Sequence, residues 1–310
     1  APDQAQSPYE ELARIGRAVA ALHSDEAQAG AHARTILGEP TLRIGRRVQG
    51  WAFYREERYD DAAAAFARLL AEWPHDPTAR LARAESLWAG GMSRAAAGSP
   101  QEDRLRAADA EYGLAIAAHD SVEARRGRAN VRLNLAQTAE RRGEDPRPVL
   151  VEALADLEVE FENAVELRGD RHAVGGLLLR HLAGAEEERG VDVRDRYREA
   201  LAEFSAAEAQ GYDRRSLAVN RSSAWLALGD SERRHGGPAR ESYRRAAEEL
   251  DGDRDLGAAL PLAWNNRANA WRALGELEAS EGNDPSGAYR QAVAGFARAL
   301  ELVPGFARAR

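Results

Sequence analysis

The fold is decided by residues 50–74, which run Gly50-Trp-Ala-Phe-Tyr-Arg-Glu-Glu-Arg-Tyr-Asp-Asp-Ala-Ala-Ala-Ala-Phe-Ala-Arg-Leu-Leu-Ala-Glu-Trp-Pro74. A turn near Glu56-Glu57-Arg58 separates two helical halves. In the second half, Ala62, Phe66 and Leu69 stand at i, i+4 and i+7, which places a small residue and an aromatic ring on one helical face. Pro74 cannot continue a helix and closes the segment. The stretch therefore predicts a helical hairpin.

The same spacing returns five times along the chain, with a small residue followed by a larger one four positions later. The copies are Ala108/Tyr112/Ala115, Ala153/Leu157/Glu160, Ala200/Phe204/Ala207, Ala239/Tyr243/Ala246 and Ala292/Phe296/Ala299. The mean spacing is 46 residues, with steps of 39 to 53. The preceding helices align as well, since 218–229 matches 264–275 and, more loosely, 125–136. Such regularity predicts a repeat array rather than a globular bundle.

These positions resemble the tetratricopeptide-repeat family, whose units place a bulky residue, a small residue and an aromatic before Ala, Phe or Tyr, Ala and a closing Pro. The matching residues are Gly50, Phe53, Ala62, Phe66 and Pro74, and again Trp264, Ala268, Trp271, Ala292, Phe296, Ala299 and Pro304. The resemblance implies an all-α fold, a right-handed α-solenoid (superhelix) of about seven antiparallel helical hairpins. It covers roughly residues 41–304.

The repeats are longer than those of the family, which recur about every 34 residues. We place the extra residues between the two helices of a unit, around 89–101, 141–148, 188–193 and 278–286. As longer helices or loops they are expected to form a ridge along one edge of the array.

Three segments are expected along the chain. Residues 1–38 form an N-terminal capping hairpin, opened by the capping box Ser7-Pro8-Tyr9-Glu10. Residues 39–304 form the repeat array, and 305–310 begin a further helix that is cut short. Because the sequence starts at Ala1 without a methionine and stops inside a repeat, we expect it to be a processed product or a fragment of a longer parent.

Composition excludes several kinds of chemistry. The chain has no lysine, so all 43 basic residues are arginine, and it has no cysteine. A Walker phosphate loop, a Schiff base, a thiolate metal site and a disulfide framework are therefore absent. The formal net charge of −8 argues against a nucleic-acid partner. No apolar run is long enough to span a bilayer, so we expect no membrane insertion and a soluble, cytoplasmic chain, with a removed targeting segment left open.

No catalytic constellation is evident. None of the seven histidines has zinc-site spacing or a convincing carboxylate partner, and we interpret them as solvated or packing residues. Acidic runs such as Glu186-Glu-Glu188 are interpreted as solvated helix surface. We expect no enzyme activity, no catalytic or metal-binding residues and no cofactor.

Groove residues follow from the resemblance. Trp51 lies one position after the packing glycine, where the family turns side chains toward its concave face. Carrying that register over gives Arg47, Trp51, Tyr54, Arg55, Arg126, Asn130, Asn134, Asn265, Asn269 and Arg272. Asparagine both donates and accepts, and arginine clamps carboxylates, so this set suits an extended peptide, acidic or C-terminal. Trp225 and Trp271 are interpreted as core aromatics.

The resulting hypothesis is a non-enzymatic interaction scaffold that binds a protein or peptide segment in the groove. The alternative is that the polar residues of the groove bind no partner. In that case the chain is a regulatory or structural appendage of a larger protein, such as a bacterial signalling kinase. It would then work through the inserted ridge or by self-association.

Overall fold

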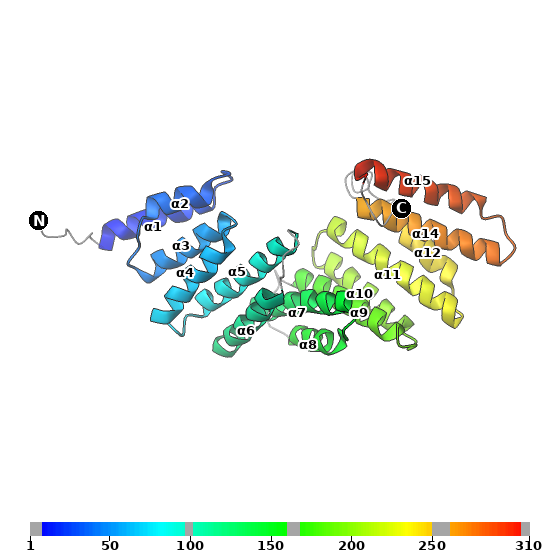
Figure 1. The fold of residues 1–310 in the computed structure, drawn as a ribbon, viewed down its shortest axis with the longest axis horizontal. Coiled ribbons are helices and arrows are strands. Elements are labelled where there is room, and N and C mark those ends of the chain that lie inside the picture. Colours follow the sequence, from blue (N-terminus) through cyan, green and yellow to red (C-terminus); the bar gives the residue numbers. More distant parts are fainter. Residues whose placement is uncertain (1–7, 97–101, 160–167, 250–260, 305–310) are drawn as a thin grey trace, which may run out of the picture. The chain divides into compact units, whose positions relative to one another are not determined.

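The computed structural model describes residues 8–96, 102–159, 168–249 and 261–304, which contain fourteen α-helices and no strand. The chain divides into two compact units, Ala1–Glu144 and Asp145–Arg310 (Figure 1). The first unit contains α1 (Pro8–Leu22), α2 (Ala29–Leu37), α3 (Arg43–Arg55), α4 (Tyr59–Glu72), α5 (Pro77–Ala96), α6 (Glu102–Ala118) and α7 (Val122–Arg142). The second contains α8 (Arg147–Leu157), α9 (Arg168–Glu187), α10 (Arg194–Ala209), α11 (Arg214–His235), α12 (Ala239–Glu248), α14 (Pro261–Ser280) and α15 (Ser286–Leu302).

Within each unit, successive helices pack on one another as hairpins. In the first unit α3 packs on α4 and α5 on α6, while α4 and α6 also contact the first helix of the next hairpin. In the second unit α9 packs on α10, α11 on α12 and α14 on α15. The all-α hairpin fold predicted from the sequence is confirmed, and the turn expected at residues 56–58 joins α3 to α4.

The repeated triplets form the interior of the hairpins. Their aromatics Phe66, Tyr112, Phe204 and Tyr243 are each at most 1% exposed. Phe66 lies so close to Gly50 that a β-carbon on this glycine would be 2.5 Å from the phenyl ring. Phe204 approaches Gly176 and Tyr243 approaches Gly229 in the same way.

The last hairpin departs from this pattern. In α15, Tyr289 rather than the predicted Phe296 approaches Gly275, and Phe296 is half-buried. Glu160 lies outside the described residues. The small residue thus lets two helices approach at an aromatic ring.

The extra length of the repeats extends mainly the first helix of a hairpin. The first helix α3 has 13 residues, whereas α5, α7, α9, α11 and α14 have 20 to 22. Residues 188–193 instead form the turn between α9 and α10. Residues 97–101, part of the first predicted insertion, lie outside the described residues.

The N-terminal hairpin of α1 and α2 packs on α3 through a buried carboxylate. Glu11 of α1 accepts hydrogen bonds from the backbone N–H groups of Thr41 and Leu42, both at 2.7 Å, and from the Thr41 hydroxyl. Leu42 is the N-cap of α3 and has no side-chain cap of its own. Glu11 therefore supplies the acceptor and the negative charge that the start of α3 needs. Burial raises the pKa of Glu11, but these hydrogen bonds outweigh burial and hold the pKa below its usual value.

We expect Glu11→Gln to lower the free energy of unfolding of the first unit at pH 7. Because the folded-state pKa is lowered, the carboxylate stabilises the fold above the ordinary glutamate pKa of about 4.3, and this contribution is lost as the pH falls through the folded value. The difference between variant and wild type should therefore shrink in acid. Urea denaturation at pH 7 and pH 3 measures it. The exposed neighbour Glu10→Gln is the control, and equal losses in both variants would contradict the assignment.

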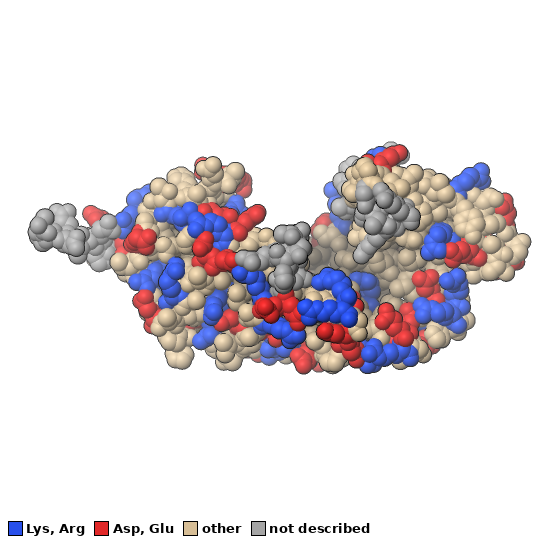
Figure 2. Space-filling model, viewed as in Figure 1, with Lys and Arg blue, Asp and Glu red and all other residues tan. Residues whose placement is uncertain are grey.

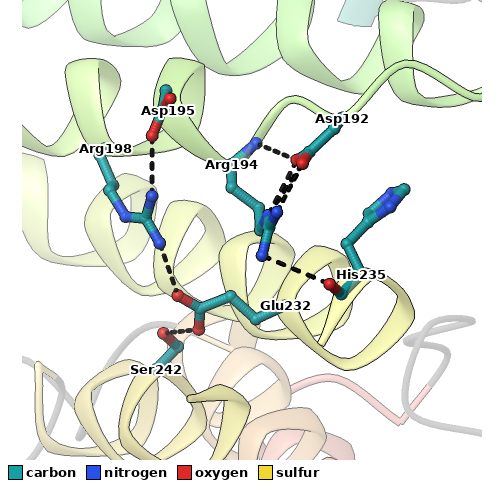
Figure 3. A network of polar contacts seen from close by, with 7 residues as sticks. All are labelled: Asp192, Arg194, Asp195, Arg198, Glu232, His235 and Ser242. Carbon is teal, nitrogen blue, oxygen red and sulfur yellow. Dashed lines mark hydrogen bonds and ion pairs between the residues drawn. The ribbon is translucent and has the colours of Figure 1, made fainter. Parts of the chain in front are cut away.

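The buried carboxylate of Glu232 joins three helices of the second unit (Figure 3). The side chain of Glu232 on α11 is 2% exposed and accepts from Arg198 of α10 at 3.0 Å. Its other oxygen accepts from the Ser242 hydroxyl of α12 at 2.6 Å. Nearby, Arg194 forks onto Asp192 in the α9–α10 turn. Both oxygens of a nearly dry carboxylate are thereby satisfied.

Candidate functional site

The groove residues predicted from the sequence fall in both units. Seven lie in the first unit, on α3 and α7, and three lie on α14 of the second.

The aromatic side chains of α3 form a cluster that leads from the core to the surface. Trp51 is half-buried and meets Phe66 edge to face, with ring centroids 5.5 Å apart. It also meets Tyr54 at 5.4 Å, and Tyr54 meets Tyr59 at 5.2 Å. Trp51 is thus held by the core while part of its surface stays open.

The arginines of α3 already have partners. Arg47 donates to Asp76 at 2.6 and 2.9 Å, and Arg43 donates to the same oxygen at 2.8 Å. The Asp76 side chain is fully buried, and its other oxygen accepts from the N–H of Ala79 at 3.0 Å, capping α5. Burial raises the pKa of Asp76, but the two arginines and this cap outweigh burial and lower it. The exposed Arg55 donates to the carbonyl of Ser24 at 3.2 Å.

The asparagines of α7 are oriented by hydrogen bonds. Trp88 of α5 donates its indole N–H to Oδ1 of Asn134 at 2.8 Å. Asn130 donates from Nδ2 to the carbonyl of Arg126 at 3.2 Å. An indole only donates and a carbonyl only accepts, so these contacts fix which end of each amide is engaged. Within the described residues, the Nδ2 of Asn134 and the Oδ1 of Asn130, one helical turn apart, make no further hydrogen bond.

Two residues of α5 that were not in the predicted groove set, Glu85 and Trp88, belong to the same face as the groove residues of α3 and α7. Glu85 and Trp88 are three positions apart on α5, which packs between α3 and α7. Burial raises the pKa of Glu85; Arg126 opposes this shift and Glu123 adds to it. Burial also raises the pKa of Tyr54, and the charge of Glu85 adds to that shift. The spacing of Leu81, Glu85 and Trp88 at i, i+4 and i+7 is the sequence signal that indicates this face.

In the second unit, α14 repeats part of this pattern. Asn269 donates from Nδ2 to the carbonyl of Asn265 at 3.0 Å, the same bond that Asn130 makes on α7. Asn265 is buried, and its Oδ1 has no hydrogen-bond partner within the described residues. The neighbouring Asn266 ties α14 to α11 through Ser223 at 2.8 Å. Arg272 is exposed and pairs with Glu276 one turn later.

Two further tryptophans lie at the core positions that the sequence predicts. Trp225 and Trp271 are half-buried and pack against the buried side chains of α11, α12 and α14. The guanidinium of Arg245 lies 5.0 Å from the ring of Trp225. Their interpretation as packing residues is therefore supported.

Two histidines lie beside carboxylates that the sequence analysis did not assign to them. His32 lies 3.5 Å from the exposed Glu26. His172 of α9 lies 2.8 Å from Glu203 of α10, so the expectation that no histidine has such a partner was wrong. The two residues are 31 positions apart in sequence, a separation that no short motif reports. Glu203 also lines a pocket of about 310 Å³, whose described lining residues carry no hydroxyl or thiol nucleophile.

No charged field stands out on the face shown in Figure 2, and no metal site stands out in the described part of the chain. It contains no group of three or more His, Asp or Glu side chains suited to holding a metal ion. None of its helices is both long and apolar enough to cross a membrane. On the face shown in Figure 2, acidic and basic side chains are interspersed rather than gathered by sign. That face therefore produces no strong electrostatic field that would attract a highly charged partner over a long distance.

Comparison with known proteins shows similarity in structure only. No protein-family model matches the chain, and no curated protein matches it in sequence. A human IFIT1 dimer with m7Gppp-AAAA is similar in structure, with 14% identity, 97% of this chain and 67% of that chain covered, and a TM-score of 0.44. The TPR2AB-domain:pHSP90-complex of yeast Sti1 is similar with 14% identity, 92% and 97% covered, and a TM-score of 0.26. The fold of the described residues, successive α-helical hairpins, rests on the helices and their packing.

Proposed function

We propose that the chain is a non-catalytic binding module that holds a protein segment against the face formed by α3, α5 and α7, hereafter the first-helix face. The observation that carries this is the pair of oriented amides on α7. Asn134 presents a donor and Asn130 an acceptor one turn apart. An extended peptide offers alternating carbonyl and N–H groups, which such a pair can bind together.

The aromatic side chains beside these amides supply contact area. Trp51, Tyr54 and Trp88 are half-buried and held by neighbours, so little side-chain freedom is lost when a segment covers them. Rigid aromatic anchors flanked by amides are typical of surfaces that bind peptides.

The test is selection of peptides on the intact chain from a random twelve-residue display library, followed by titration of resynthesised peptides. We expect Asn134→Ala and Asn130→Ala each to weaken binding by about tenfold, equivalent to about 1.4 kcal/mol. Asn283→Ala, an exposed asparagine in the α14–α15 turn, is the matched control and should bind as wild type.

Two results would contradict the proposal. One is selected peptides whose affinity is unchanged in both α7 variants. The other is tight, salt-dependent binding of an oligoadenylate RNA that competes with the peptides, since this would make the face a nucleic-acid surface.

A further inference from the structure

One side of α15 carries a valine in the middle of a line of solvent-exposed side chains. α15 is the last described helix of the second unit and packs on α14 (Figure 1). Arg290, Val293, Ala297 and Glu301 are all exposed and stand at i, i+3, i+7 and i+11, so they form one line along the helix, hereafter the α15 stripe. Val293 is 67% exposed, and within the described residues only Tyr9 is a more exposed large hydrophobic side chain.

The residues around Val293 suit contact with another helix. Ala294 is exposed like Ala297, and such short side chains allow a second helix axis to approach closely. Tyr289, whose ring lies against Gly275 of α14, is still 37% exposed and extends the apolar surface by one turn. The middle of α15 therefore presents a helix-packing surface on its exposed side.

The two charges of the α15 stripe oppose the dipole of their own helix. Arg290 lies near the start of α15, where the dipole favours an anion, and Glu301 lies in the last turn, where it favours a cation. Arg290 donates to the carbonyl of Ser286 at 3.2 Å and acts on the charge of Asp284, but it makes no ion pair within the described residues. Glu301 has only an exposed pair with Arg298, of a kind that stabilises little.

The same charges are complementary to a second α15 that runs antiparallel to the first. A two-fold axis between positions 295 and 296 sets position 290 of one copy opposite position 301 of the other, because both lie equally far from the axis. Arg290 and Glu301 then pair twice, and Val293 of each copy meets Ala297 of the other. Each charge also reaches the end of the opposite helix that favours its sign.

We propose that the α15 stripe is the contact of an isologous dimer, in which α15 packs antiparallel on the α15 of a second copy. An isologous contact closes on itself, so the assembly stops at two copies. The proposal is independent of the proposed function, because α15 and the amides of α7 belong to different units.

The experiment is sedimentation equilibrium of the intact chain at low salt, which limits the screening of surface ion pairs. The chain is measured from about 1 µM to about 1 mM, because a contact between two single helices is small and weak. We expect a monomer–dimer equilibrium that Val293→Asp weakens by about a hundredfold, since two carboxylates would lie close together in the contact. Val151→Asp on α8, where the valine is 54% exposed, is the matched control and should dimerise as wild type.

Exchange of the charges tests the antiparallel arrangement. Arg290→Glu and Glu301→Arg should each weaken dimerisation by about tenfold, because each brings like charges together twice. The double variant Arg290→Glu/Glu301→Arg should recover most of the wild-type affinity, and a mixture of the two single variants should form a mixed dimer. These positions are exposed, so the thermal stability of each variant should stay close to that of the wild type.

Three results would overturn the proposal. The first is a wild-type chain that stays monomeric up to about 1 mM. The second is a dimer that Val293→Asp leaves intact or that Val151→Asp weakens equally. The third is a dimer whose affinity neither single charge reversal changes.

Discussion

Replacing Arg198 with alanine is expected to lower the free energy of unfolding of the second unit by roughly 1–3 kcal/mol, since it leaves the buried carboxylate of Glu232 without its charged partner. The Glu232 side chain is 2% exposed, whereas Arg198 is 49% exposed and can be hydrated from outside. The loss therefore falls on Glu232, which would keep only the hydroxyl of Ser242.

Urea denaturation followed by tryptophan fluorescence, together with amide hydrogen exchange in α10–α12, measures this loss. Arg298→Ala serves as control because it breaks only an exposed i,i+3 pair with Glu301, worth about 0.3–0.5 kcal/mol. Adding Glu232→Gln to Arg198→Ala should restore most of the stability, because a neutral amide can still accept from Ser242. Equal, small losses for Arg198→Ala and Arg298→Ala would refute this account of the buried carboxylate.

Gly127→Ala is expected to destabilise the first unit by about 1–3 kcal/mol, the usual cost of overpacking a core. A β-carbon at Gly127 would lie 2.5 Å from Cζ of Tyr112 and 2.7 Å from its hydroxyl. Tyr112 is 1% exposed and cannot move aside without disturbing α5 and α6. The change is unfavourable even though alanine normally favours a helix over glycine.

Gly16→Ala is the matched variant because a β-carbon there meets nothing within 4 Å on α1. With no clash, the helix preference alone acts, and the variant should gain about 0.5–1 kcal/mol. The two substitutions are chemically identical and are expected to have opposite signs in the same denaturation experiment. Stabilisation by both would show that the glycine on α7 is not a packing residue.

The hairpins could be predicted from the sequence because the residues that pack their interiors recur at regular spacing. Each buried aromatic, such as Phe66 or Tyr243, recurs with small residues at fixed helical spacing, and one pattern is enough to place a helix and its inner face. The exception in α15, where Tyr289 approaches the glycine, arises because two aromatics seven positions apart lie on nearly the same face.

The polar contacts could not be predicted, because they join side chains on different helices. Asp76 holds Arg47 from 29 positions away, and Trp88 and Asn134 are 46 positions apart. Periodicity places each residue on a face but does not say which partner it meets. The groove set therefore stays a prediction: Asn130 and Asn134 are oriented by internal hydrogen bonds, whereas Arg47 is already engaged by an internal carboxylate.

The fork of Arg43 and Arg47 on Asp76 has a mechanical consequence. It joins two points on α3 to the residue that caps α5, so the two helices are coupled at the start of α5. The start of α3 and the start of α5 therefore share one buried carboxylate as their anchor. Separating the two helices at this point would break the bonds of both arginines and the cap of α5 at the same time.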